Sequence, residues 1–207
     1  LLATSVVFIL AMGLWTNYFN ELADLPNNMQ EAFEMIMRNP LGIIAVVIMA
    51  PIVEELLFRG AIQGHLLRKW KHPAGAIVLS SLIFGVVHGN WVQAPFAFVT
   101  GLALGWMYYR TGSLLPGILM HFVNNSAAVA SFLLADDPNA TMVSTYGQTG
   151  AALMAAGGMA LTIICVLFIQ KKLVPQPAVW HQPAQAETIE IENNTLSSQT
   201  HSHNENI

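Results

Sequence analysis

Long apolar runs, each near the length of a membrane-spanning helix, alternate along this chain with short polar segments. Asp, Glu, Lys and Arg are absent from residues 1–20, 39–53, 73–109, 111–135 and 138–170. A helix needs about 20 mostly apolar residues to cross a bilayer, and the runs lack the period of two that is typical of barrel strands. The pattern predicts six membrane helices, at residues 1–19, 41–66, 74–90, 94–109, 113–135 and 149–170.

The predicted fold class is therefore all-α, a polytopic transmembrane helix bundle in residues 1–172. Residues 20–40 interleave acidic residues with Met and Phe, which predicts an amphipathic helix on the membrane surface that begins near Asn27 or Asn28. Residues 173–207 contain prolines followed mainly by polar residues. They are too poor in apolar side chains to form a core, so we expect a disordered tail.

Composition and charge narrow the class of protein further. Hydrophobic residues make up 54% of the chain and charged residues 10%, which excludes a water-soluble globule. The net charge of −4 offers no basic surface, so nucleic acid is not an expected partner. The basic residues that follow the second, fourth and sixth predicted helices are Arg68, Lys69, Lys71, Arg110, Lys171 and Lys172. They share one side of the membrane by helix parity, and this excess predicts that the basic loops and the tail are cytoplasmic.

Small residues spaced four apart predict close packing in two of the runs. They are Gly101 and Gly105 in the fourth predicted helix, and Ala152, Ala156 and Ala160 in the sixth. The lone cysteine, Cys165, excludes a disulfide within these residues and is expected to be a buried or lipid-facing apolar side chain.

Ionisable side chains interrupt the second run. Glu54, Glu55 and Arg59 would each cost a few kcal/mol if they faced lipid, so we expect them to face the protein interior. Glu55 and Arg59 are four residues apart on one helix face, in the order that favours an ion pair. Glu54 is rotated by about 100° from Glu55 and has no basic residue one turn away. We predict that Glu55 pairs with Arg59 and that Glu54 is free for proton chemistry.

Two other runs carry histidines. The third ends with Phe84 and His88, and the fifth contains His121 and Asn125, each pair sharing a helix face. With Glu54, these groups suit hydrolysis. A Glu can act as general base toward water, a neutral His can position the water, and His with Asn can donate hydrogen bonds to an oxyanion. We expect them to line an interior polar cavity that opens to the cytoplasm.

Other catalytic chemistries fit the sequence less well. No serine lies in a Gly-x-Ser-x-Gly motif, and Cys165 has no His near it in sequence. A Glu with two His could bind zinc, but the spacing lacks the His-Glu-x-x-His helix that places two ligands one turn apart. We therefore expect no cofactor and no metal ligands, with zinc as an alternative that the spacing does not favour.

The motifs resemble those of the CAAX protease and bacteriocin-processing family, also called CPBP or Abi. The matching motifs are Glu54-Glu55-x-x-x-Arg59, Phe84-x-x-x-His88 and His121-x-x-x-Asn125, in this order on separate apolar helices. The stretch from Arg110 to Pro116 is also similar to the family's approach to its third motif. The resemblance covers residues 41–130. It implies an integral-membrane endopeptidase related to the enzyme that removes the last three residues of prenylated CAAX proteins.

Roles for the residues follow from this resemblance. It implies that Glu54 activates water without a metal, that His88, His121 and Asn125 are the other catalytic groups, and that Glu55, Arg59 and Phe84 support them. It also implies a bacterial inner-membrane location and a peptide or membrane-protein substrate, such as a prenylated CAAX end or a leader peptide. Two alternatives stay open. One is a non-catalytic immunity or scaffold protein of the same family, and the other is a small proton-coupled transporter, which the lack of visible inverted repeats disfavours.

Overall fold

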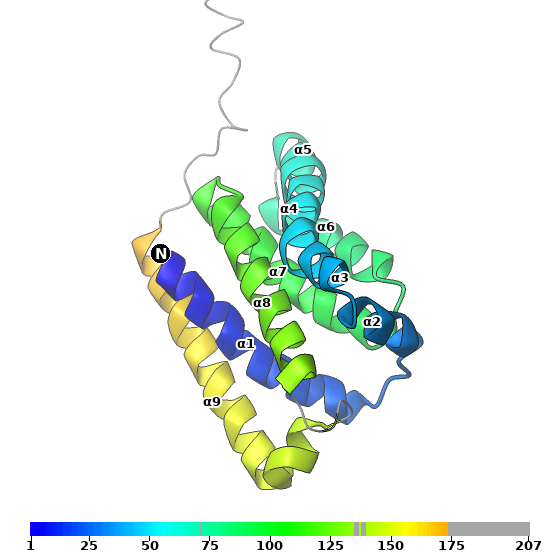
Figure 1. Ribbon diagram of the computed structural model, residues 1–207. Coiled ribbons are helices and arrows are strands. Elements are labelled where there is room, and N and C mark those ends of the chain that lie inside the picture. Colours follow the sequence, from blue (N-terminus) through cyan, green and yellow to red (C-terminus); the bar gives the residue numbers. More distant parts are fainter. Residues whose placement is uncertain (71, 135–136, 138–139, 174–207) are drawn as a thin grey trace, which may run out of the picture. The chain divides into compact units, whose positions relative to one another are not determined.

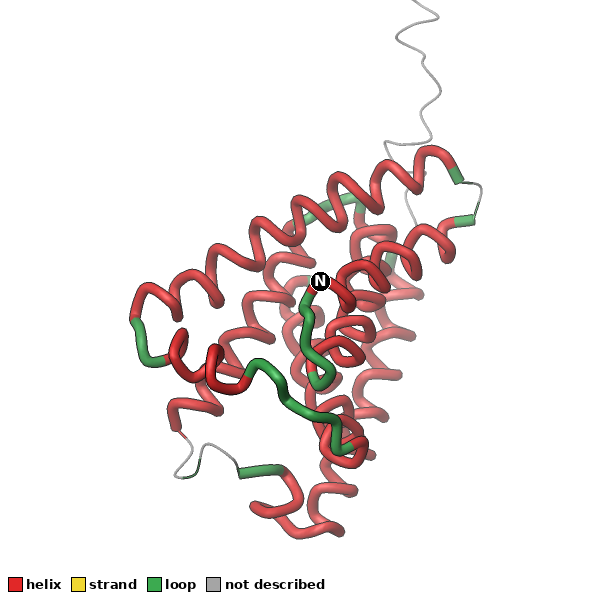
Figure 2. Tube along the Cα trace, turned by 90° about the vertical axis from the view of Figure 1, so that its right-hand side faces the viewer, coloured by secondary structure: helices red, strands yellow, loops and turns green. Residues whose placement is uncertain are grey.

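All regular structure in the described part of the chain is helical. The computed structural model describes residues 1–70, 72–134, 137 and 140–173. Its elements are α1 (Leu2–Ala23), α2 (Gln30–Met37), α3 (Pro40–Ile44), η1 (Ala45–Met49), α4 (Ala50–Glu54), η2 (Glu55–Gln63), α5 (Gly64–Lys69), α6 (Pro73–Val87), α7 (Gln93–Thr111), α8 (Leu115–Leu134) and α9 (Met142–Lys172) (Figure 1). Figure 2 shows these helices joined by short loops. The all-α prediction is confirmed, while the predicted tail lies outside the described residues from residue 174 onward.

Four helices are long and apolar enough to cross a membrane by themselves. They are Leu2–Ala23, the continuous Pro40–Lys69, Leu115–Leu134 and Met142–Lys172. The other two predicted spans form helices that do not meet this standard. α6 has only 15 residues, roughly 22 Å of helix, and α7 mixes polar residues such as Gln93 and Arg110 with apolar ones. The polytopic bundle is confirmed, with α6 and α7 packed along each other rather than as two independent spans.

α1 and α9 form the second closely packed pair. The buried side chains shared by α1, α7, α8 and α9 are Phe8, Ile9, Met12, Ala103, Leu104, Met107, Met120, Cys165 and Ile169. On α9 the buried face near its middle consists of Ala151, Ala155 and Gly158, whereas Ala156 and Ala160 are exposed. The predicted Ala152–Ala156–Ala160 stripe was therefore the wrong face, because small residues recur at four-residue spacing on more than one face of this alanine-rich helix.

The segment Pro40–Lys69 is one continuous helix with two π-helical stretches. Asn39 starts it, because its side chain accepts a hydrogen bond from the Leu41 amide at 2.9 Å and Pro40 takes the first helical position. The stretches η1 and η2 flank a short α-helical part that contains Pro51 and ends at Glu54. π-Helical turns are rare and frequently lie at functional sites.

α2 begins at Gln30, two or three residues after the predicted start, and the loop before it lies beside the turn between α6 and α7. The Asn27 side chain accepts from the Met29 amide at 3.3 Å and from Asn90 Nδ2 at 2.9 Å. The Asn28 side chain donates to the Gly89 carbonyl at 3.1 Å. We call this set of four residues, Asn27, Asn28, Gly89 and Asn90, the asparagine junction. It ties the loop before α2 to the turn after α6.

The ends of α5, α7 and α9 gather at one end of the bundle. Arg110 donates to the Gln170 carbonyl at 2.7 Å, which joins the end of α7 to the end of α9. α5 and α7 also lie close together, since a Cβ added to Gly64 would lie 3.3 Å from the Tyr108 hydroxyl. At the other end, Glu21 accepts from the Val143 amide at 3.2 Å. We call the end where α5, α7 and α9 finish the basic end, because basic residues lie in their last turns. We call the end where Glu21 contacts Val143 the acidic end.

Two adjacent glycines of α9 provide a matched test of the α1–α9 contact. A Cβ on Gly158 would lie 2.6 Å from the Ala11 carbonyl oxygen and 2.8 Å from Leu14 Cβ, whereas a Cβ on Gly157 meets nothing within 4 Å. We expect Gly158→Ala to destabilise the protein by about 1–3 kcal/mol, as overpacking does. Gly157→Ala should be neutral or stabilising by up to about 1 kcal/mol. Thermal unfolding in detergent checks this, and equal effects of the two substitutions would contradict the packing.

Candidate active site

The two adjacent acids of the long helix lie in different environments. Glu54 ends α4 and its side chain is 30% exposed, whereas Glu55 begins η2 and its side chain is 1% exposed. The exposed acid faces a cavity and the buried acid faces neighbouring helices. This division agrees with the roles that the sequence spacing predicts for them.

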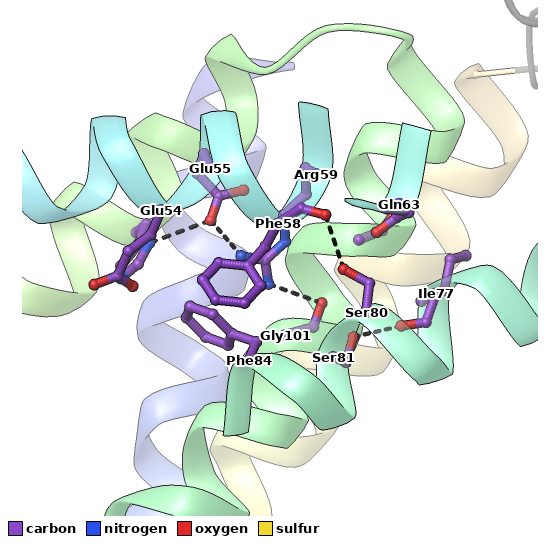
Figure 3. Close-up of polar contacts among 12 residues, drawn as sticks. Glu54, Glu55, Phe58, Arg59, Gln63, Ile77, Ser80, Ser81, Phe84 and Gly101 are labelled. Carbon is purple, nitrogen blue, oxygen red and sulfur yellow. Dashed lines mark hydrogen bonds and ion pairs between the residues drawn. The ribbon is translucent and has the colours of Figure 1, made fainter. Parts of the chain in front are cut away.

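Glu55 and Arg59 form the predicted ion pair inside the protein. Arg59 Nη1 lies 2.7 Å from Glu55 Oε1, and both side chains are 1% exposed. Arg59 Nη2 donates to the Gly101 carbonyl at 3.3 Å (Figure 3). The guanidinium carbon also lies 4.4 Å from the centre of the Phe84 ring. These partners offset the burial of the charge, because an uncompensated charge in this setting is strongly destabilising. Arg59 Nε and Glu55 Oε2 have no hydrogen-bond partner among the described residues.

The ion pair continues into a line of buried polar side chains, Glu55, Arg59 and Gln63, which we call the polar strip. Gln63 donates to the Gly105 carbonyl at 2.8 Å, one turn beyond the contact of Arg59 with Gly101. A Cβ on Gly105 would lie 2.6 Å from Gln63 Oε1. Gly101 and Gly105 were predicted only to let helices pack closely. Because they have no side chains, they also let Arg59 and Gln63 reach the backbone carbonyls of α7.

His121 of α8 lies between the two acids. Its Nδ1 is 3.2 Å from Glu55 Oε1 and its Nε2 is 3.7 Å from Glu54 Oε2. Because Glu55 is paired with Arg59 and accepts hydrogen bonds, we assign the proton of the neutral ring to Nδ1. The lone pair of Nε2 then faces Glu54, at a separation too long for a direct hydrogen bond.

His88 directly follows α6 and its side chain stays close to the last turn of that helix. Its Nδ1 lies 2.7 Å from the Phe84 carbonyl oxygen, and its ring meets the Phe84 ring edge-on at 4.9 Å between centres. A carbonyl accepts only, so Nδ1 is the donor here and Nε2 of the neutral ring is an acceptor. The chain turns away at the next residue, Gly89, with a φ of 62° that favours glycine.

Asn125 of α8 supplies a hydrogen bond that Pro51 cannot make. In η1 the Ala50 amide donates to the Ala45 carbonyl, five residues back. The next bond in that series would run from residue 51 to Val46, but proline has no N–H. Asn125 Nδ2 donates to the Val46 carbonyl instead, at 2.9 Å. One of the two amide hydrogens of Asn125 is thus used to attach α8 to the long helix.

A cavity of about 280 Å³ brings the predicted site residues together. The lining includes Glu54, Phe84, His88, His121 and Asn125, while Glu55 and Arg59 are buried behind it. It also includes polar residues that sequence reasoning did not select, Gln93, Thr100 and Asn124. Adjacency to Asn125 was the available signal for Asn124, which donates to Asn125 Oδ1 at 3.3 Å. The sequence gave no comparable signal for Gln93 and Thr100.

The cavity lies nearer the acidic end of the bundle than the basic end. Its lining includes His88 and Gln93, which flank the turn between α6 and α7, and Phe33 of α2. These elements belong to the acidic end. The helical parity that predicts the sidedness does not predict at which depth a cavity forms, because this depends on how far the helices slide along one another.

The donor groups near the cavity do not form a metal-binding set. Among the residues that the structure describes, no group of three or more His, Cys, Asp or Glu side chains is placed to hold a metal ion. The two nitrogens of His121 are directed toward Glu55 and Glu54, and Nδ1 of His88 contacts a backbone carbonyl. We therefore derive no step through a metal.

Comparison with known proteins shows which family the middle of the chain resembles. Residues 37–127 match the family model of type II CAAX prenyl endopeptidase Rce1-like proteins. YdiL of Bacillus subtilis (strain 168), named as a membrane peptidase, is 32% identical over 102 residues, 49% of this chain and 41% of its own length. The membrane-embedded CAAX protease MroQ of Staphylococcus aureus (strain USA300) is 30% identical over 112 residues, 52% of this chain and 45% of its own. No solved structure matches the chain.

The matched segment contains all three motifs, from Glu54 to Asn125. Residues 37–127 are thus similar to the Rce1-like CAAX endopeptidase family, which confirms the resemblance predicted from those motifs. The chain spans less than half the length of each of these two relatives, 41% and 45%.

The ion pair of the polar strip is expected to be essential for stability. Arg59→Met leaves the Glu55 carboxylate buried without its partner, and the expected cost is roughly 3–5 kcal/mol. The exposed pair Glu34–Arg38 is a matched control, because it has the same four-residue spacing, an N–O distance of 3.9 Å and a 78% exposed arginine side chain. Arg38→Met should change stability by less than about 1 kcal/mol. Thermal unfolding of both variants in detergent measures the difference, and similar costs would contradict the buried pair.

A double-mutant cycle tests the replacement of the proline N–H by Asn125. Asn125→Ala removes the donor to the Val46 carbonyl and should cost about 1–3 kcal/mol. In a Pro51→Ala background the backbone gains an N–H, so the cost of Asn125→Ala should fall by about 1 kcal/mol. The readout is again the unfolding midpoint. Equal costs in the two backgrounds would show that the Asn125 contact does not compensate for the missing proline N–H.

Proposed function

We propose that this chain forms the catalytic part of a membrane-embedded endopeptidase, which hydrolyses a peptide bond with a water activated by Glu54. The observation that carries the proposal is the contrast between the adjacent acids. Glu54 is 30% exposed and lines a polar cavity, whereas Glu55 is buried and paired with Arg59. A general base has to reach water and substrate, and this supports Glu54 over Glu55.

In this mechanism, His121 positions the attacking water. With its Nδ1 proton directed to Glu55, the ring presents Nε2 as an acceptor 3.7 Å from Glu54 Oε2. A water that donates one hydrogen to Nε2 and one to the Glu54 carboxylate keeps its lone pairs for attack. As its oxygen bonds to the substrate carbonyl carbon, Glu54 takes the proton. Glu54 then delivers this proton to the amine nitrogen when the C–N bond breaks.

Asn125 and His88 are the remaining groups proposed for catalysis. One hydrogen of the Asn125 amide is directed to Val46, so the second is the one available to an oxyanion. His88 donates Nδ1–H to the Phe84 carbonyl, so its Nε2 accepts in the neutral ring and donates to an oxyanion only in the protonated ring. Glu55, Arg59 and Phe84 act by holding these groups in place.

The proposed substrate is a peptide or a membrane-protein segment. The family description and the printed name of MroQ both refer to CAAX processing. Four helices suited to crossing a bilayer and relatives from two bacteria support a multi-pass protein of the bacterial inner membrane. Leader peptides and prenylated CAAX ends are therefore the two substrate types to assay first.

Substitution of the two acids by glutamine tests the mechanism. Glu54→Gln keeps the side-chain shape but removes the base, so we expect cleavage to fall by at least about 10²-fold with the unfolding midpoint little changed. Glu55→Gln should instead lower the unfolding midpoint, because Arg59 loses its charged partner. The assay uses purified protein in detergent with a prenylated CAAX peptide and a panel of leader peptides.

Controls separate the alternative mechanisms. Asp24→Asn changes an exposed acid at the end of α1 and should cleave at the wild-type rate. A chelator should leave the wild-type rate unchanged, and loss of activity that added zinc restores would replace the glutamate mechanism by a metal one. Full activity of Glu54→Gln, in cleavage or in a cellular phenotype, would contradict the proposal and favour a non-catalytic member of the family.

A further inference from the structure

Thr100 of α7 carries a buried hydroxyl that the proposed mechanism does not use. The residue is 3% exposed, and its Oγ1 has no hydrogen-bond partner among the residues that the structure describes. The other buried serine and threonine side chains in the described part of the chain donate to backbone carbonyls: Ser5 to Leu1, Thr16 to Met12, Ser80 to Phe58 and Ser81 to Ile77. Burial of a hydroxyl without a partner is unfavourable, so this exception needs an explanation.

Packing does not explain the hydroxyl of Thr100. A valine has a similar shape and would leave no polar atom unpaired in an apolar helix. A threonine can also donate to the carbonyl four residues earlier, as Thr111 of the same helix does to Met107 at 2.8 Å. Thr100 makes no such bond to Phe96. Its hydroxyl therefore serves neither the core nor its own helix.

Thr100 belongs to the face of α7 that lines the cavity, together with Gln93, Phe96 and Ala97. Residues at these spacings share one side of a helix. The face has an apolar middle and a polar residue at each end. Gln93 and Thr100 are about 10 Å apart along the helix axis, which equals about three residues of an extended peptide. A peptide that lies along this face can thus meet a polar group at both ends.

Thr100 occupies the end of this face that lies beside the two acids. The carbonyl of the next residue, Gly101, accepts a hydrogen bond from Arg59 (Figure 3). The other guanidinium nitrogen of Arg59 lies 2.7 Å from Glu55 Oε1. Glu54 directly precedes Glu55 and lines the same cavity as Thr100. The unpaired hydroxyl is therefore at the level of the proposed base.

We infer that Thr100 binds the main chain of the substrate, with its hydroxyl donating a hydrogen bond to a peptide carbonyl beside the scissile bond. The inference rests on the proposed function, because it concerns how a peptide is held next to Glu54. The catalytic groups present mainly acceptors, which are the Glu54 carboxylate and the Nε2 atoms of His88 and His121. A carbonyl needs a donor, and the Thr100 hydroxyl is one that has no other use. Such a contact positions a peptide without selecting its side chains.

Conservative substitutions of Thr100 test this contact by cleavage in detergent. The probes are the prenylated CAAX peptide and the panel of leader peptides. Thr100→Val removes the hydroxyl and should raise KM by about three- to tenfold, the effect of one neutral hydrogen bond, with kcat changed by less than about twofold. Thr100→Ser keeps a hydroxyl and should stay within about twofold of the wild-type KM. An unchanged KM in Thr100→Val would overturn the inference.

The unfolding midpoint separates a substrate contact from a structural one. Thr100→Val should unfold at the wild-type temperature or above it, because it removes a buried polar atom that has no partner. A lower midpoint would show that the hydroxyl stabilises the fold, and would overturn its assignment to the substrate. Thr16→Val is the matched control, because Thr16 is also buried but its hydroxyl donates to the Met12 carbonyl of α1. This control should leave KM unchanged.

Replacement of single peptide carbonyls by thiocarbonyls, one position at a time, identifies the partner of the hydroxyl. Sulfur is the weaker acceptor, so wild type should bind less tightly when the carbonyl that contacts Thr100 is replaced. Thr100→Val should lose less than half as much affinity for that peptide, because the two changes remove the same contact. Equal losses in both proteins at every position would overturn the inference.

Binding to an inactive protein distinguishes this inference from the proposed function. In a Glu54→Gln background, fluorescence anisotropy of the same labelled peptides gives Kd without cleavage. Thr100→Val should raise this Kd by about three- to tenfold. A raised Kd with no cleavage by wild type would support the peptide contact and contradict the proposed function. Cleavage by wild type with an unchanged Kd, or no binding of any peptide, would overturn the inference.

Discussion

The buried ion pair between Glu55 and Arg59 is the constraint on which the arrangement around the site depends. A carboxylate and a guanidinium that are 1% exposed need each other and further polar contacts, because desolvation of an unpaired charge costs several kcal/mol. The partners come from three different elements: the Gly101 carbonyl of α7, the Phe84 ring of α6 and His121 of α8. Satisfying this one pair therefore fixes the positions of α6, α7 and α8 relative to the long helix.

The irregular geometry of the long helix serves the same purpose. Pro51 lies between two π-helical stretches, and the carbonyl it leaves without a backbone donor is taken by Asn125. The bond attaches α8 at Val46, the second residue of η1 and five residues before Pro51. Glu54 then ends the α-helical part, so its carboxylate faces the cavity while Glu55 faces the strip. The hydrogen bond that Pro51 cannot make in the long helix is thus replaced by one from the Asn125 side chain of α8.

Much of the architecture could be predicted because apolar runs report directly on helices. Each of the six runs forms a helix. The pairing of Glu55 with Arg59 could also be predicted, because residues four apart lie on the same side of an α-helix and of a π-helix. The failures have a different origin. The packed face of α9 was misassigned because small residues recur at four-residue spacing on more than one face. The depth of the cavity could not be predicted, because the sequence does not encode how far the helices slide along one another. Thr100 carried no signal, since a lone threonine in an apolar helix is common.

The polar strip also has a consequence for how the protein is made. The helix Pro40–Lys69 leaves the ribosome before α7 and α8, which hold the groups that neutralise and hydrogen-bond its charges. Released into lipid by itself, this helix would expose two acids and an arginine at a cost of a few kcal/mol each. Its charges are therefore fully compensated only after about 60 more residues, up to the end of α8, have been synthesised. The buried ion pair of the active site thus determines when the long helix becomes stable in the membrane.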